Sequence, residues 1–148
     1  MGLDMYLEAE IYLAEYSFPQ EQNKIGKLFP NMAKFNKPKI IKWEVAYWRK
    51  ANQIHKWFID NIADGVDECK DYYVGIEDLE RLLVVVENVL EHNELAMTLL
   101  PPTPGFFFGG TEIDKLYFED LKYTKEQLTK ICNNKFLKGL DFTYHASW

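Results

Sequence analysis

The chain has few cysteines and histidines, the residues that form disulfides and that often bind metals or act in catalysis. Its two cysteines, Cys69 and Cys132, lie far apart without metal-ligand spacing and are typical of reduced thiols. Its three histidines form neither a His-x-x-x-His nor a Glu-x-x-His pattern, which argues against a zinc or di-iron site. No Gly-x-Ser-x-Gly, Walker or dinucleotide-binding sequence occurs. We therefore expect no metal and no cofactor, and we assign no catalytic residue.

Long hydrophobic runs and secretion signals are also missing. The apolar stretches are far shorter than the roughly 20 residues of a membrane-spanning helix, so we expect no membrane attachment. The opening sequence MGLDMYLEAE carries acids where a signal peptide needs basic residues, which favours a cytoplasmic protein. At 148 residues, the chain is long enough for one hydrophobic core, and we expect a single domain over 1–148.

Aromatic residues and segregated charge are the features that the chain does have. Its 4 Trp, 9 Tyr and 10 Phe exceed the needs of an average core, and such residues also favour interfaces and flat ligands. The net charge is −6, yet residues 17–56 carry +7 and the remainder carries −13. Such an uneven charge distribution concentrates anions at the basic region. A lysine-rich solvated loop without a ligand would give the same pattern. The acidic remainder disfavours long nucleic acid, so the expected ligand is a small anion.

Period-two patterns at both ends of the chain predict strands. Residues 3–13 alternate apolar with polar side chains, and DFTYHASW at 141–148 alternates again. The segment 71–75, DYYVG, is predicted to be a short strand or an extended link. We expect the first and last strands to pair, because each would otherwise be an exposed edge.

Helical patterns occupy most of the middle of the chain. The strongest covers 44–63, and others cover 76–96 and 111–132, where Thr111 is the predicted N-cap. Residues 17–43 lose all periodicity and hold three prolines, which predicts a lysine-rich loop or lid. The expected fold is therefore α+β, with about three helices packed on a small sheet that pairs the N- and C-terminal strands.

The sequence GFFFGG at 105–110 has two interpretations. As a strand buried on both faces, it would place Phe106 and Phe108 on one face and Phe107 on the other. As a loop between glycine hinges, it would present one ring for stacking on a ligand. We favour the strand. In either case Gly109, Gly110 and Thr111 are predicted to open a helix, whose free backbone amides bind anions.

The segment YWRKANQIHKWF places polar side chains beside an apolar stripe. Asn52 and His55, flanked by Trp48 and Arg49, could hydrogen-bond the polar edge of a ligand, and His55 could act as an acid or base. The alternative is a buried histidine and asparagine that are satisfied by backbone groups.

Several of these segments together resemble a known protein group. MGLDMYL, VAYWRKANQIHKWF, GFFFGG, YFEDL and the aromatic last strand resemble a family of small, largely uncharacterised bacteriophage and prophage proteins. The resemblance spans most of the chain except 17–43 and the stretch before DFTYHASW. It implies a context, the cytoplasm of a host bacterium and action against host defence, and it carries over no functional residue.

These observations favour a binding protein without chemistry. We expect it to sequester a small anionic, nucleotide-like ligand, such as a nucleotide second messenger, and to form a homo-oligomer. The alternatives are a nucleotide-processing enzyme with His55 as general base and a protein–protein inhibitor of a host enzyme. Predicted ligand-binding residues are Trp48, Arg49, Lys50, Asn52, His55, Phe106, Phe107, Gly109, Gly110 and Thr111.

Overall fold

The alternating sequence at the start of the chain forms a central strand of a four-stranded antiparallel sheet. The computed structural model describes residues 2–148, and the sheet has the order β2-β1-β4-β3. The strands are β1 (Asp4–Tyr12), β2 (Ile40–Arg49), β3 (Tyr72–Val74) and β4 (Asp141–Ser147). The helices are α1 (Pro19–Leu28), α2 (Asn52–Ile62), α3 (Ile76–Glu91), α4 (Ala96–Leu99) and α5 (Lys115–Cys132), with 3-10 turns at Asn93–Leu95 and Leu137–Gly139.

The pairing of the N- and C-terminal strands is confirmed. β1 and β4 run antiparallel from Asp4 opposite Ser147 to Glu10 opposite Asp141. The two strands have complementary alternation, because each turns apolar side chains to one face of the sheet. The three predicted strands at 3–13, 71–75 and 141–148 are therefore all present, and the protein is an α+β protein as expected.

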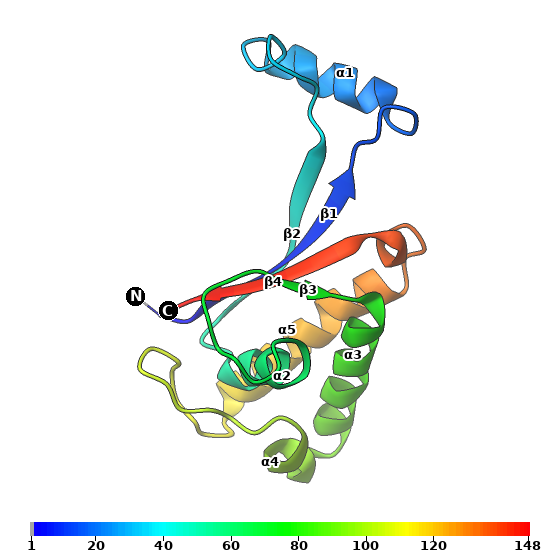
Figure 1. Cartoon of the computed structure of the whole chain (residues 1–148). Helices are drawn as coiled ribbons and strands as arrows, with labels where there is room; N and C mark the ends of the chain where they lie inside the picture. The colour runs from blue at the N-terminus through cyan, green and yellow to red at the C-terminus, as the bar shows by residue number, and fades with distance from the viewer. Residues whose placement is uncertain (1) are drawn as a thin grey trace.

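One face of the sheet packs on the helices and holds the core. Figure 1 shows α2, α3 and α5 on the same side of the sheet. Met5 and Leu7 of β1 and Phe142 and Tyr144 of β4 are at most 1% exposed, and they belong to one cluster with buried side chains of these helices. In the described part of the chain, the other face carries no helix (Figure 1). Antiparallel sheets tolerate this, because their outward side chains are polar or amphipathic.

The predicted helix over 44–63 is wrong in its first third. Residues up to Arg49 belong to β2, and α2 begins at Asn52. Between them Lys50 adopts a positive φ of 62°, which turns the chain from strand to helix. Pairing with β1 overrides the helical spacing, because Ala46 and Trp48 bury on the same face as Leu7 and Met5 opposite them.

The predicted loop over 17–43 contains regular structure. It holds α1 and the start of β2, and Pro19 stands in the first turn of α1, where its missing N–H costs nothing. Residues 13–39 form a separate lobe, which projects from the sheet at the end of β1 and β2 (Figure 1). The lobe closes at its base through a hydrogen bond from the Leu13 N–H to the Lys39 carbonyl, 2.7 Å long.

Two other helix boundaries differ from prediction. The helix expected over 76–96 ends at Glu91, and the helix expected from 111 starts at Lys115. Asp114, not Thr111, is its N-cap, and the Asp114 carboxylate accepts a 3.1 Å hydrogen bond from the Tyr117 N–H. None of the helices in residues 2–148 combines the length and the apolar composition that a membrane crossing requires.

Candidate functional site

The residues predicted from the sequence gather at the β2–α2 junction, but several of them are buried. Trp48 is 2% exposed, and its indole N–H donates to the Thr124 hydroxyl at 2.8 Å. A ring held in this way cannot stack on a ligand. Arg49 and Lys50 are exposed, and their side chains lie beside Gly2, whose missing Cβ leaves space for both. The predicted cationic residues thus reach solvent, whereas the predicted stacking residue does not.

Asn52 is fully committed to the loop 103–110. Its amide nitrogen donates to the carbonyls of Phe108 at 3.0 Å and Gly110 at 2.8 Å, while its oxygen accepts from the Thr103 N–H at 3.0 Å. The side chain is 2% exposed, so it has no free edge for a ligand. The alternative from the sequence, an asparagine satisfied by backbone groups, matches this arrangement.

His55 lies between two partners inside the fold. Its Nδ1 is 2.7 Å from the Tyr144 hydroxyl, and its Nε2 is 3.1 Å from both Asp67 carboxylate oxygens. Since the carboxylate only accepts, Nε2 carries the proton and Nδ1 accepts from Tyr144 in the neutral ring. Burial lowers the pKa of His55, although the Asp67 carboxylate pulls it in the opposite direction. A 1% exposed ring with both nitrogens occupied cannot serve as a general base for an outside substrate.

The phenylalanine run is a turn and not the predicted strand. Phe106 is 90% exposed, Phe107 is half-buried and Phe108 is 6% exposed, so the three rings have three different environments. The segment makes a backbone hydrogen bond to the start of the sheet, from the Leu3 N–H to the Phe107 carbonyl. Gly109 has a φ of 88°, a conformation that suits glycine and ends any extended run.

The predicted anion site at Gly109, Gly110 and Thr111 is not at a helix terminus. The chain stays irregular until Lys115, so these residues present no row of free helix amides. Beside Gly110, Lys50 and Asn52 line a hollow of about 110 Å³ together with three carboxylates. The carboxylates are those of Glu112, Asp114 and Asp120. A hollow that small and that acidic is a poor receptor for a nucleotide.

Asp120 in this hollow makes stability depend on pH. Burial raises the pKa of its carboxyl from 3.8 to about 6, which the bond from Gln53 only partly opposes. Folding therefore favours the protonated carboxyl, so this contribution to stability is present at low pH and is lost as pH rises through about 6. We expect Asp120→Asn to raise the free energy of unfolding by about 1 kcal/mol at pH 8, after allowance for solvent screening, and by little at pH 4.5.

Urea unfolding at the two pH values measures this difference. The control is Asp60→Asn, because Asp60 is an exposed carboxylate that pairs with Lys56 at 2.6 Å. Asp60→Asn should lower the free energy of unfolding by a few tenths of a kcal/mol at pH 8. A gain for Asp120→Asn that is the same at both pH values would contradict a titrating origin.

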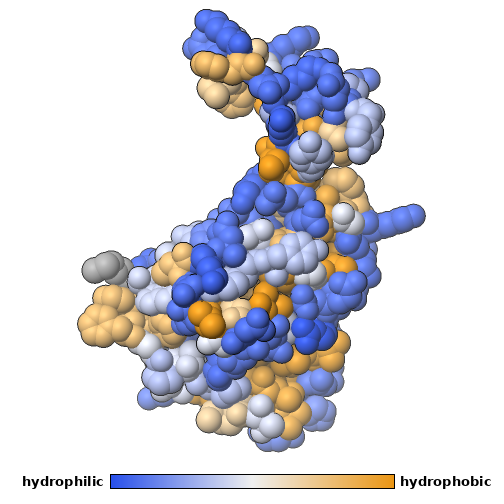
Figure 2. Space-filling view, in the orientation of Figure 1, coloured by the Kyte–Doolittle hydropathy of each residue, from blue (hydrophilic) through white to orange (hydrophobic). Residues whose placement is uncertain are grey.

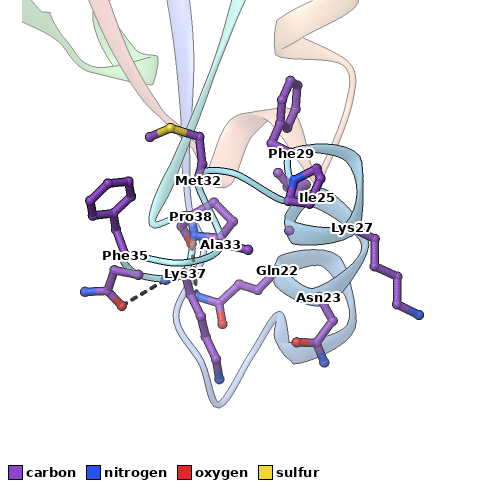
Figure 3. Close-up of a pocket in the computed structure, with 13 residues that line it drawn as sticks. Gln22, Asn23, Ile25, Lys27, Phe29, Met32, Ala33, Phe35, Lys37 and Pro38 are labelled. Carbon is purple, nitrogen blue, oxygen red and sulfur yellow. Dashed lines mark hydrogen bonds between the residues drawn. The ribbon is translucent and has the colours of Figure 1, made fainter.

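A large pocket lies in the lobe. It has a volume of about 900 Å³ and opens between α1 and the returning segment 29–38 (Figure 3). The lining combines apolar side chains with the cations Lys27 and Lys37 and the amides of asparagine and glutamine. The thirteen lining residues are Gln22, Asn23, Ile25, Gly26, Lys27, Phe29, Pro30, Met32, Ala33, Phe35, Asn36, Lys37 and Pro38.

Gln22 ties the two sides of this pocket together. Its amide nitrogen donates to the Leu13 carbonyl at 2.7 Å and to the Pro38 carbonyl at 3.1 Å, which fixes the amide orientation. The side-chain oxygen is buried and has no hydrogen-bond partner within the described chain. Gln22 was not among the predicted residues, because a glutamine in a lysine-rich segment gives no sign of burial. The sequence did indicate a binding region in this segment through its lysines together with Phe29 and Phe35.

Within residues 2–148, no group of three or more histidine, cysteine, aspartate or glutamate side chains is placed to hold a metal ion. Comparison of the chain with protein-family models, with curated proteins and with solved structures finds no match. The pocket in the lobe is the candidate functional site.

Proposed function

We propose that this protein binds and sequesters a small anionic, nucleotide-like ligand in the pocket of the lobe. The observation that carries the proposal is a pocket of about 900 Å³ within the basic part of an acidic chain. Residues 13–39 carry a net charge of +3, whereas the rest of the chain carries −9. A cationic pocket on an acidic protein concentrates small anions and repels extended polyanions.

The lining suits a ligand with a flat apolar part and a charged part. Phe29 and Phe35 supply aromatic faces, and Lys37 supplies positive charge for a phosphate. Lys27 points outward from α1 (Figure 3), so it adds positive charge at the rim of the pocket. Lys37 also pairs with Glu15, so a phosphate would compete with this carboxylate. The unpartnered Gln22 oxygen offers an acceptor to an N–H of a base after a small shift of the side chain.

Binding without turnover is the version of this proposal that the pocket favours. The thirteen residues of its lining include no histidine, cysteine, aspartate or glutamate to act as acid, base or nucleophile at neutral pH. The resemblance to phage and prophage proteins suggests the setting. We propose that the ligand is a nucleotide second messenger and that the protein works in the cytoplasm of a host bacterium as a counter-defence sponge.

A thermal-shift screen of the purified protein tests the proposal. The panel holds mono- and dinucleotides, cyclic di- and trinucleotides and ADP-ribose derivatives. A ligand at a hundred times its Kd should stabilise the fold by about 2.7 kcal/mol, which raises Tm by several degrees. Calorimetric titration of the best ligand then measures Kd, and chromatography of the mixture after long incubation detects any product.

Variants of the lining locate the site. Phe35→Ala should weaken binding about fivefold or more, because stacking on one ring is worth about 1–3 kcal/mol. The double variant Lys27→Glu with Lys37→Glu should abolish binding. Its matched control is Lys122→Glu with Lys135→Glu, two exposed lysines outside the lobe, which should leave Kd within about twofold. If no ligand of the panel raised Tm, or if both double variants lost the same binding affinity, the proposal would be wrong. Either result would favour the protein–protein inhibitor.

A further inference from the structure

The open face of the sheet holds like charges directly opposite one another. Glu8 on β1 faces Glu44 on β2, and Glu10 on β1 faces Asp141 on β4. Lys42 lies between the two central glutamates, 3.6 Å from Glu8 and 3.5 Å from Glu10. Like charges at directly opposed positions destabilise a strand pair. A partner that brings further cations to this face would relieve the repulsion.

The same face carries a row of rings. Tyr6 stacks on His145 with 4.7 Å between centroids, and Tyr47 tilts against the other side of Tyr6 at 5.3 Å. On the edge strand β3, Tyr73 is 69% exposed. Aromatic side chains next to charged groups are enriched at protein interfaces, because they bury area and also offer polar contacts. The face thus combines negative charge with a surface suited to docking.

The lobe presents the complementary surface. Lys24, Lys34 and Lys39 are exposed and lie outside the lining of the ligand pocket. Leu28 is 73% exposed and also lies outside that lining, and Figure 2 shows apolar side chains on the lobe beyond the neck that joins it to the body. Apolar side chains gathered with cations on a projecting element are typical of an interaction surface.

The two surfaces cannot meet within one copy. The lobe continues from the ends of β1 and β2, so it extends past its own sheet and not across the open face (Figure 1). The chain therefore carries a positive, partly apolar projection and a negative, aromatic face that are available to other molecules. A second copy of the chain supplies both complements at once.

We propose that the lobe of one copy docks on the open sheet face of a second copy, in a two-fold dimer where both lobes are engaged. Such an arrangement is self-complementary, because each contact that one copy makes is repeated by the other. Lys24, Lys34 and Lys39 of the lobe meet Glu8, Glu10, Glu44 and Asp141 of the opposite face. Charge complementarity fixes which surfaces meet, and the exposed rings and aliphatic side chains supply buried area.

Sedimentation of the protein at about 100 μM in low salt measures the oligomeric state. The wild type should sediment as a dimer, which weakens as salt screens the charges. The double variant Lys24→Glu with Lys34→Glu reverses the charge of the lobe. The double variant Glu44→Lys with Asp141→Lys reverses the charge of the open sheet face. Each double variant should weaken self-association tenfold or more, because lobe and face then carry like charge. The control Lys122→Glu with Lys135→Glu should leave the dimer unchanged.

Mixing the two reversed variants gives the sharpest test. In a mixed pair, the negative lobe of the first variant meets the positive face of the second. In the other contact, the positive lobe of the second variant meets the negative face of the first, so both contacts are attractive. Heterodimers should therefore form from two proteins that are each monomeric, and native mass spectrometry distinguishes them by mass. This recovery also shows that both variants fold. A monomeric wild type, reversed variants that still dimerise, or a mixture that stays monomeric would each overturn the proposal.

Discussion

Replacing Asn52 by alanine should lower the free energy of unfolding by about 3 kcal/mol. The side chain makes one buried and two partly buried hydrogen bonds to the loop 103–110, and alanine would leave two carbonyls and one N–H without partners. Each such bond contributes about 1 kcal/mol, and each buried group left unpaired costs a further 1–3 kcal/mol unless water reaches it. Water can enter at Gly110, which is exposed, so we expect the lower end of this range. Urea unfolding at neutral pH measures the loss.

Asn61→Ala provides a matched control on the same helix. Asn61 is exposed, and its amide donates to the Trp57 carbonyl one turn earlier, so its loss should cost less than about 0.5 kcal/mol. Asn52→Asp should be worse than Asn52→Ala at neutral pH, because a carboxylate would face the carbonyls of Phe108 and Gly110. If Asn52→Ala were no more costly than Asn61→Ala, the loop would not depend on this anchor.

His55→Ala should cost about 3 kcal/mol at neutral pH. The change removes a buried ring that contacts Phe108 and Trp148 edge-on, and it leaves the Tyr144 hydroxyl unpaired in the core. Burial raises the pKa of Tyr144 well above its ordinary value, so this hydroxyl stays protonated and needs an acceptor. Loss of a large buried side chain and of a buried hydrogen bond each contribute to the expected cost.

The same histidine should make the wild type sensitive to mild acid. Because folding lowers the pKa of His55, the unfolded state binds the proton more tightly. Stability from this group is present above an unfolded pKa of about 6.5 and declines as pH falls from there toward the folded pKa. His55→Ala should therefore remove this decline between about pH 7 and pH 5 and leave only the opposite dependence that Asp120 contributes. His92→Ala is the control, since His92 is exposed, and it should keep the wild-type profile.

An NMR titration of the imidazole signals checks the assignment directly. The His55 ring should be mostly neutral at pH 6.5, and Tyr144→Phe should leave Nδ1 without its donor while sparing the hydrogen bond from Nε2 to Asp67. A His55 signal that titrates above 6.5 would mean that Asp67 outweighs burial, and the slope of stability against pH would then reverse. These outcomes separate a structural histidine from one that exchanges protons with a substrate.

The sheet was predictable because its central strands alternate strictly. In β1 the apolar Met5, Leu7 and Ala9 are all at most 1% exposed, and β4 repeats the pattern with Phe142, Tyr144 and Ala146. Period two at that length indicates a strand, and the pairing of the chain ends was predicted because each strand would otherwise be an exposed edge. The bounds of β2 did not follow, since the apolar residues of 44–49 fit a helix as well as a strand until β1 is placed beside them.

The candidate site was less predictable, because residue type does not reveal what a side chain faces. Asn52 and His55 were correctly recognised as polar residues beside a core stripe, yet their partners are Phe108, Gly110, Asp67 and Tyr144 of the same chain. These contacts join positions far apart in sequence, which no local pattern encodes. The lobe pocket depends on the packing of α1 against segment 29–38. This helix was not predicted, because the prolines and lysines of 17–43 interrupt the helical pattern of apolar residues.

The pairing of β1 with β4 has a consequence for synthesis. Residues 4–10 find their second neighbour only in residues 141–147, so the central strand keeps one unpaired edge until residues 141–147 have left the ribosome. β3 pairs with β4 as well, and it also waits for the last strand. Contacts of such long sequence separation fold slowly, and open strand edges attract other nascent chains. A pause in translation before residues 141–147 emerge therefore leaves this edge of the sheet open for longer.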